Sequence, residues 1–188
     1  MLYLCLIIFM KDFITYVLPN KKKFQKVNVN RVELNFLESK VVEYFNVKNL
    51  TEVRDRFEGA TFLNNFLEKA LPIFVLEKYL KISIIDWDNI DIKKIKDYIL
   101  IGDKKVNLIF FKDELPLINE KNQNPIIFFQ SNDFKEISIC GYADIDVLET
   151  YQKNIKEYGI GSKLKKMTSF YGFEKLKIFS KLDELKSF

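Results

Sequence analysis

The first half of the chain is dominated by apolar residues that recur at helical spacing. Intervals of three and four residues predict helices over Glu33–Phe45 and Thr51–Phe57, with Thr51 placed to cap the second one. The broadest apolar stripe covers Thr61–Leu80 and predicts the longest helix. Pro72 lies inside that stripe, where its ring opposes the carbonyl of Glu68, so we expect a kink or a restart of the helix there.

The middle of the chain changes period. Short apolar runs, rich in β-branched and aromatic residues and bounded by polar turns, are typical of strands. Lys81–Trp87 is expected to be a short strand of this kind. Four further strands in a row are expected at Asp97–Gly102, Lys105–Lys112, Pro125–Ser131 and Glu136–Ala143.

The C-terminal part returns to helical spacing. Asp144 is a suitable N-cap for a helix over Ile145–Glu157. Gly159–Ser162 is the best candidate for a linker. In the tail, apolar residues recur about every third position from Phe170 to Leu185, which predicts a short helix docked on the core.

These elements predict an α+β fold in a single domain that spans residues 1–188. The core is expected over about residues 30–158, with N-terminal helices packed on a central mixed sheet of four to five strands. A helix and a short helical tail over residues 163–188 are expected to follow. At 188 residues with 48% hydrophobic content, the chain is long enough and apolar enough to bury a core.

Cysteine usage and the opening segment bear on the compartment. Cys5 and Cys140 are the two cysteines, which excludes a cysteine-rich zinc site and a disulfide framework. The apolar stretch Met1–Phe9 is far shorter than the roughly 20 residues that span a bilayer. We therefore expect a cytoplasmic protein with no membrane span. Met1–Phe9 is expected to be a buried strand, or an extension upstream of a start at Met10.

The complete absence of histidine is the sharpest chemical constraint. It excludes Ser-His-Asp and Cys-His triads, histidine-zinc hydrolases and haem sites with a proximal histidine. The six glycines form neither a Walker A motif nor a GxGxxG motif. The enzyme chemistry that remains uses carboxylates and lysines. Acids that hold Mg²⁺ beside a lysine suit phosphodiester hydrolysis.

The predicted order of elements resembles the PD-(D/E)XK restriction-endonuclease-like superfamily over roughly residues 60–155. Asp97 leads the first strand of a hairpin, and the later strand ends in the pair Gly141–Tyr142 before a helix. The resemblance implies that Asp97 is a metal ligand and that Glu68, on the preceding helix, completes a Mg²⁺ site. Glu68 also lies on the polar stripe of that helix, where an exposed side chain is the alternative. Asn107 then stands where the family has a catalytic acid, and Ile109 stands where it has lysine. Both departures weaken metal binding and water activation.

Two other groups of residues spell a possible catalytic site. Asp91–Ile92–Lys93 is literally acid-x-Lys, and Lys112–Asp113–Glu114 places Lys112 and Glu114 at the end of a strand. Either group is expected to serve as a substitute site or to be an ordinary exposed loop. Glu77, on the same helix as Glu68, is a further acid that could join a metal site or lie at the edge of the core.

The charge is distributed unevenly. Residues 1–60 carry a net charge of +3, residues 61–150 carry −4 and residues 151–188 carry +5. Basic ends around an acidic middle fit a phosphate-binding wall around a metal centre, or ordinary solvated faces. The candidate nucleic-acid contacts are Lys21, Lys22 and Lys23 near the start and Lys163, Lys165 and Lys166 near the end.

Three functions therefore stay open at this stage. The first is a metal-dependent nuclease that acts on DNA, for example as a restriction or mobile-element component. The second is a member of the same fold that binds DNA but has lost its catalytic site. The third is a non-enzymatic α+β interaction or assembly subunit, which would act as a homodimer or with a protein partner and without nucleic acid.

Overall fold

The computed structural model describes residues 11–158 and 165–185, and within them it has the predicted α+β class. The helices are α2 (Arg31–Phe45), α3 (Leu50–Arg54), α4 (Gly59–Leu80) and α5 (Ile145–Tyr151). The strands are β1 (Gln25–Asn28), β2 (Tyr98–Ile101), β3 (Lys104–Phe111), β4 (Leu117–Asn119), β5 (Ile126–Gln130), β6 (Glu136–Ala143), β7 (Gln152–Tyr158) and β8 (Lys165–Phe170). Short 3-10 turns cover Leu18–Lys23, Ile92–Lys94, Phe173–Lys175 and Leu182–Leu185.

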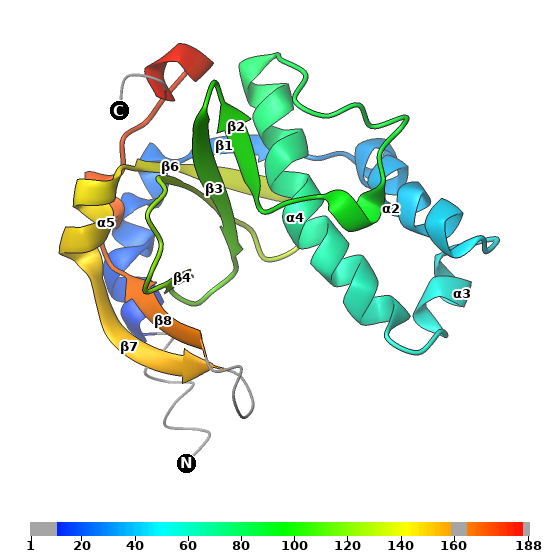
Figure 1. Ribbon diagram of the computed structural model, residues 1–188, viewed down its shortest axis with the longest axis horizontal. Coiled ribbons are helices and arrows are strands. Elements are labelled where there is room, and N and C mark those ends of the chain that lie inside the picture. The colour runs from blue at the N-terminus through cyan, green and yellow to red at the C-terminus, as the bar shows by residue number, and fades with distance from the viewer. Residues whose placement is uncertain (1–10, 159–164, 186–188) are drawn as a thin grey trace.

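The centre of the fold is a mixed five-stranded sheet with the strand order β1-β6-β5-β3-β2. Strands β3 and β5 run parallel, and the other neighbours run antiparallel. Figure 1 shows α2, α3 and α4 on one side of this sheet and α5, β7 and β8 on the other. The second side carries a smaller sheet with the order β4-β8-β7, which the sequence pattern did not predict.

Strand β5 explains why the sheet needs cover on both faces. All five of its residues are buried. Ile127 and Phe129 belong to the core beneath the helices, whereas Ile126 and Phe128 belong to a second core beneath the small sheet. Because successive side chains of a strand point to opposite faces, a continuous apolar run is what a doubly covered strand requires.

The helical side is fixed by caps and by one long apolar stripe. Asn30 and Glu33 form a reciprocal capping box at the start of α2, with bonds of 2.9 Å and 2.8 Å between side chains and backbone amides. Helix α4 continues through Pro72, so the helix does not restart there. Its neighbours Leu71 and Ile73 are buried, so packing on the sheet holds the helix across the missing hydrogen bond.

The predicted strand at Lys81–Trp87 is wrong, because its backbone bonds to a side chain instead of to another strand. The Glu77 carboxylate accepts hydrogen bonds from the amides of Ile84 and Ile85 at 2.6 and 2.8 Å. It also accepts one from the indole Nε1 of Trp87 at 2.6 Å. Glu77 is therefore the organiser of an irregular loop.

The predicted helix over Ile145–Glu157 is too long. Asp144 caps it as expected and accepts from the Val147 amide at 2.9 Å, but the helix ends at Tyr151 and the chain continues as β7. Strand β7 pairs with β8, which is a partner that local spacing cannot reveal.

The predicted helical tail is likewise wrong. The described part of the tail forms β8 and short 3-10 turns. Its apolar residues nevertheless pack as expected, since Phe170, Phe173 and Phe179 are buried in the two cores. The spacing of about three residues therefore identified the buried positions, but it predicted a helix where the chain forms a strand and 3-10 turns.

Some expectations fall outside the described residues. These are the structure of Met1–Phe9, the linker Gly159–Ser162 and the position of Lys163. Within the described ranges, no helix combines the length and the apolar character that a membrane crossing requires.

Candidate functional site

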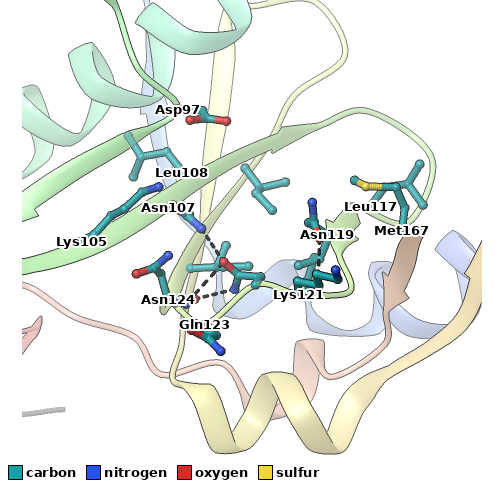
Figure 2. Close-up of a pocket in the computed structure, with 14 residues that line it drawn as sticks. Asp97, Lys105, Asn107, Leu108, Leu117, Asn119, Lys121, Gln123, Asn124 and Met167 are labelled. Atoms are coloured by element: carbon teal, nitrogen blue, oxygen red, sulfur yellow. Dashed lines mark hydrogen bonds between the residues drawn. The ribbon is translucent and has the colours of Figure 1, made fainter. Parts of the chain in front are cut away.

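A pocket of about 550 Å³ lies against strand β3, between the central sheet and the turn that follows β4. Figure 2 shows it with its side chains. Five side-chain amides and three charged groups contribute to its lining. The polar lining residues are Asp97, Lys105, Asn107, Asn119, Lys121, Asn122, Gln123 and Asn124.

Asn107 is fixed in this pocket by a chain of amides. Its Nδ2 donates to Oδ1 of Asn122 at 2.6 Å, and Nδ2 of Asn122 donates to the carbonyl of Asn124 at 2.6 Å (Figure 2). The backbone amide of Asn107 also donates to the carbonyl of Pro125 at 2.9 Å. The side chain is half-buried, so this position holds a neutral, hydrogen-bonded amide where the resemblance leads one to expect a carboxylate.

Asp97 lies next to β2 and lines the same pocket as Asn107. Its carbonyl accepts a hydrogen bond of 2.7 Å from the amide of Leu108, which fixes the register of the hairpin at this point. The Asp97 side chain is exposed, and it is the only carboxylate among the lining residues. Asp97 and Asn107 both contribute to this lining, but the register of the hairpin places Tyr98, and not Asp97, opposite Asn107.

Two lysines give the pocket an excess of positive charge over Asp97. The Lys105 ammonium lies 4.2 Å from the centre of the Tyr98 ring, which is a cation–π distance. Lys121 is exposed and belongs to a turn in which its backbone amide donates to Oδ1 of Asn119 at 2.9 Å. Both ammonium groups are available to an anion at the mouth of the pocket.

The rest of the lining is apolar and comes from strands. Ile118 and Ile126 are almost fully buried, whereas Ile109, Leu117 and Met167 are partly accessible. Ile109 stands where the resemblance leads one to expect a lysine. The pocket thus combines an amide-rich turn with hydrocarbon walls.

Glu68, the third member of the expected metal site, does not line this pocket. Its carboxylate forms an ion pair of 3.3 Å with Lys112, at the end of β3, and both side chains are nearly half exposed. The Lys112 ammonium also lies 5.6 Å from the centre of the Phe134 ring. Glu114, the other candidate at this strand end, is exposed in the following loop.

Asp91 and Lys93 have separate partners. The Asp91 carboxylate caps the turn Ile92–Lys94, and a hydrogen bond from Lys94 holds the pKa of Asp91 below its ordinary value. The Lys93 ammonium lies 5.1 Å from the centre of the Tyr44 ring, and Tyr44 raises the pKa of Lys93. The acid-x-Lys triplet therefore forms a capped turn, and its lysine contacts Tyr44 on helix α2.

The described lysines of the two basic clusters, Lys21, Lys22, Lys23 and Lys166, lie outside the pocket lining. Lys21, Lys22 and Lys23 are exposed at the end of the 3-10 turn Leu18–Lys23. Lys166 is exposed on β8, whereas Lys163 and the side chain of Lys165 fall outside the described residues.

The residues present do not fit the Mg²⁺ site that the resemblance implies. Mg²⁺ prefers carboxylate oxygens in near-octahedral geometry, and the pocket offers Asp97 as its single carboxylate. Within the described residues, no three carboxylates or thiols gather closely enough to hold a metal ion.

Sequence reasoning identified Asp97 and Asn107 but missed the residues that complete the pocket. Asn122 comes from the turn after β4, and Met167 reaches the pocket from β8. The one available signal was the density of amides between Asn119 and Asn124.

Comparison with known proteins adds no relative. No family model matches the chain, and neither the curated proteins nor the solved structures contain a match.

Proposed function

We propose that this protein binds DNA without cleaving it, and that the pocket beside β3 belongs to the binding surface. The observation that carries the proposal is the bond between Asn107 and Asn122, in a pocket that also presents Lys105 and Lys121. This is the second of the three functions left open by the sequence: a protein with the restriction-endonuclease-like fold that binds DNA but has lost its catalytic site.

The case against cleavage rests on what each expected catalytic position does. Asn107 is neutral and held by Asn122, so it supplies no charge to a metal. Ile109 has no group that could activate water or stabilise a leaving oxygen. Glu68 is neutralised by Lys112 outside the pocket. These positions therefore do not supply the acid–base chemistry that cleavage requires.

The case for DNA rests on charge and hydrogen-bonding capacity. Lysines supply the phosphate contacts that dominate affinity for DNA, and side-chain amides both donate to and accept from base edges. The pocket offers both, and the whole chain carries a net charge of +4. The exposed run Lys21–Lys23 offers a second phosphate contact. A DNA partner and the buried Cys140 thiol are both compatible with the cytoplasm, which we include in the proposal.

The test measures affinity for a labelled duplex by fluorescence anisotropy at about 50 and 200 mM salt, with and without Mg²⁺. The proposal predicts binding that weakens steeply with salt and leaves the duplex intact. A double variant, Lys105→Gln with Lys121→Gln, is expected to lower the salt slope by about two. The matched control is Lys48→Gln with Lys69→Gln, which removes the same charge from exposed positions on the helical side.

Two results would contradict the proposal. One is that the protein shows no affinity for DNA at low salt, or that the two double variants bind DNA with equal affinity. The other is Mg²⁺-dependent cleavage that disappears in Asp97→Ala, which would restore the nuclease hypothesis.

One observation favours a protein partner as the alternative function. Phe57 is 93% exposed in the turn between α3 and α4, beside Arg54 and Arg56. A large exposed aromatic next to arginine has the composition of an interface hot spot. If Phe57→Ser abolished a concentration-dependent increase in mass on a sizing column, the chain would be a homodimer or an assembly subunit of the kind left open by its sequence.

A further inference from the structure

The pocket beside β3 offers both hydrogen-bonding groups and apolar groups. Its amides come from Asn107 and from the segment Asn119–Asn124, whereas its hydrocarbon comes from strands β3, β4, β5 and β8. Figure 2 shows Gln123 and Asn124 near Asn107, with Leu117 and Met167 at the other end. A ligand here would meet directional bonds along one edge and dispersion contacts over another part of its surface.

Several polar groups in the lining have donors or acceptors that form no hydrogen bond within the described residues. Asn107 uses its Nδ2 on Asn122, and no hydrogen bond within the described residues engages its Oδ1. Within the described residues, no hydrogen bond engages the side-chain amides of Gln123 and Asn124 or the ammonium of Lys121 either. Their donors and acceptors are therefore open to a molecule in the pocket.

These groups define a ligand with three properties. It has an edge with both hydrogen-bond donors and acceptors, because the open amides supply both kinds. It has an apolar surface, which Ile109 and Met167 would cover. It carries negative charge outside its apolar part, where Lys105 and Lys121 lie. A nucleobase attached to a phosphate has all three properties, and asparagine and glutamine are side chains that read adenine.

Simpler ligands use only part of this lining. A divalent cation would find one carboxylate, Asp97, and would leave the hydrocarbon walls unused. An inorganic anion would engage Lys105 and Lys121 but not the amide acceptors. The volume of about 550 Å³ lies within the range of pockets that hold small organic ligands.

We infer that this pocket takes a nucleobase, presented either by a free mononucleotide or by an unpaired nucleotide in a DNA strand. The inference deepens the proposed function, because it assigns to the same surface a site for one base. Bases are read in this way when they leave the stack and enter a pocket that bonds their edge and covers their face.

The experiment compares three labelled duplexes of one sequence: fully paired, with one unpaired adenine, and with an abasic nucleotide in place of that adenine. Fluorescence anisotropy gives each affinity, and adenosine monophosphate is titrated separately by calorimetry. We expect the unpaired adenine to bind about tenfold more tightly than the abasic duplex, consistent with one good base contact. The mononucleotide is expected to compete for the same site.

Two variants and a control locate the effect. Gln123→Ala changes an exposed side chain, so its fold is expected to be intact, and Asn107→Leu removes an amide at similar size. Both are expected to reduce affinity for the unpaired adenine more than affinity for the paired duplex, and so to reduce the tenfold preference. Asn64→Ala, on the exposed face of α4, is expected to change neither.

Each outcome separates the two proposals. Equal affinity for all three duplexes, with no binding of the mononucleotide, overturns the base pocket and leaves DNA binding standing. Binding of the mononucleotide, lost in Asn107→Leu and Gln123→Ala but without affinity for any duplex, supports the base pocket and overturns the proposed function. A preference for the unpaired adenine that survives in both variants places the base elsewhere and overturns the inference.

Discussion

The two faces of the central sheet use polar side chains in opposite ways. On the helical face, Glu77 accepts hydrogen bonds from a loop and Glu68 forms an ion pair with Lys112. These carboxylates, which were candidates for catalysis, therefore make structural contacts. On the other face, Asn107 and Gln123 line a pocket and retain capacity for a ligand. Glu68 and Glu77 on the long helix therefore have partners within the protein, whereas the neutral amides keep groups that a ligand could contact.

The largest expected effect tests whether the two faces contribute equally to stability. Phe128 and Phe129 are adjacent on β5 and fully buried, one in each core. Substitution of either by alanine is expected to lower the free energy of unfolding by about 4 kcal/mol, because both leave a large cavity. Urea denaturation followed by circular dichroism measures each. A loss below about 1 kcal/mol for Phe128→Ala would show that the small sheet does not form a real second core.

A smaller but still large effect is expected at Glu77. Glu77→Ala removes the acceptor of three hydrogen bonds and is expected to destabilise the protein by about 3 kcal/mol. Affinity for DNA should be unchanged where the protein remains folded. Glu149→Ala, at an exposed acid, is the matched control. If Glu77→Ala were as stable as that control, the account of the loop Lys81–Trp87 would be wrong.

Asp144, at the start of α5, is expected to contribute about 1 kcal/mol through its charge. Its carboxylate accepts a hydrogen bond of 2.8 Å from Lys177, which holds the pKa of Asp144 below its ordinary value. Because the pKa of Asp144 is lower in the folded state than in the unfolded state, its ionised carboxylate stabilises the protein at any pH above the unfolded-state pKa. This stabilisation is lost as the pH falls through the folded-state pKa.

Asp144→Asn keeps the cap but removes the charge, so its stability should approach that of the wild type as the pH falls from about 7 to about 3. Thermal unfolding at several pH values measures the difference. A difference between the two proteins that stayed constant over this range would contradict the assigned ion pair.

The smallest effect is expected at Glu68. Glu68→Gln breaks an ion pair whose two side chains are 41% and 48% exposed, so the expected loss is about 0.5 kcal/mol or less. DNA binding should be unaffected, because Glu68 lies outside the pocket. A large fall in DNA affinity would show that the helical face takes part and would remove the contrast between the faces.

The sequence predicted best where structure depends on local pattern. The strand Glu136–Ala143 is confirmed at both ends, and the cap at Asp144 is confirmed, because strand-forming apolar runs and capping depend on neighbouring residues. Lys81–Trp87 was mistaken for a strand because nothing local reveals that Glu77 takes its backbone amides. Strands β7 and β8 were mistaken for helix because their stability comes from each other.

The candidate site was predictable to the same degree. The hairpin itself was predictable, because a tight turn brings neighbouring strands together, but its register places Tyr98, and not Asp97, opposite Asn107. Asn122 could not be assigned as the partner of Asn107, since the contact joins a strand to an irregular turn fifteen residues away. Side chains held by such turns become visible only in three dimensions.

The central claim is that DNA occupies the amide pocket, and the side-chain amide signals in a ¹⁵N-¹H correlation spectrum test it most directly. On titration with DNA, the signals of Asn107, Asn122 and Gln123 are expected to shift, while those of Asn64 and Asn65 on α4 stay in place. Shifts confined to Asn64, Asn65 and their neighbours, with the pocket amides unchanged, would contradict the account.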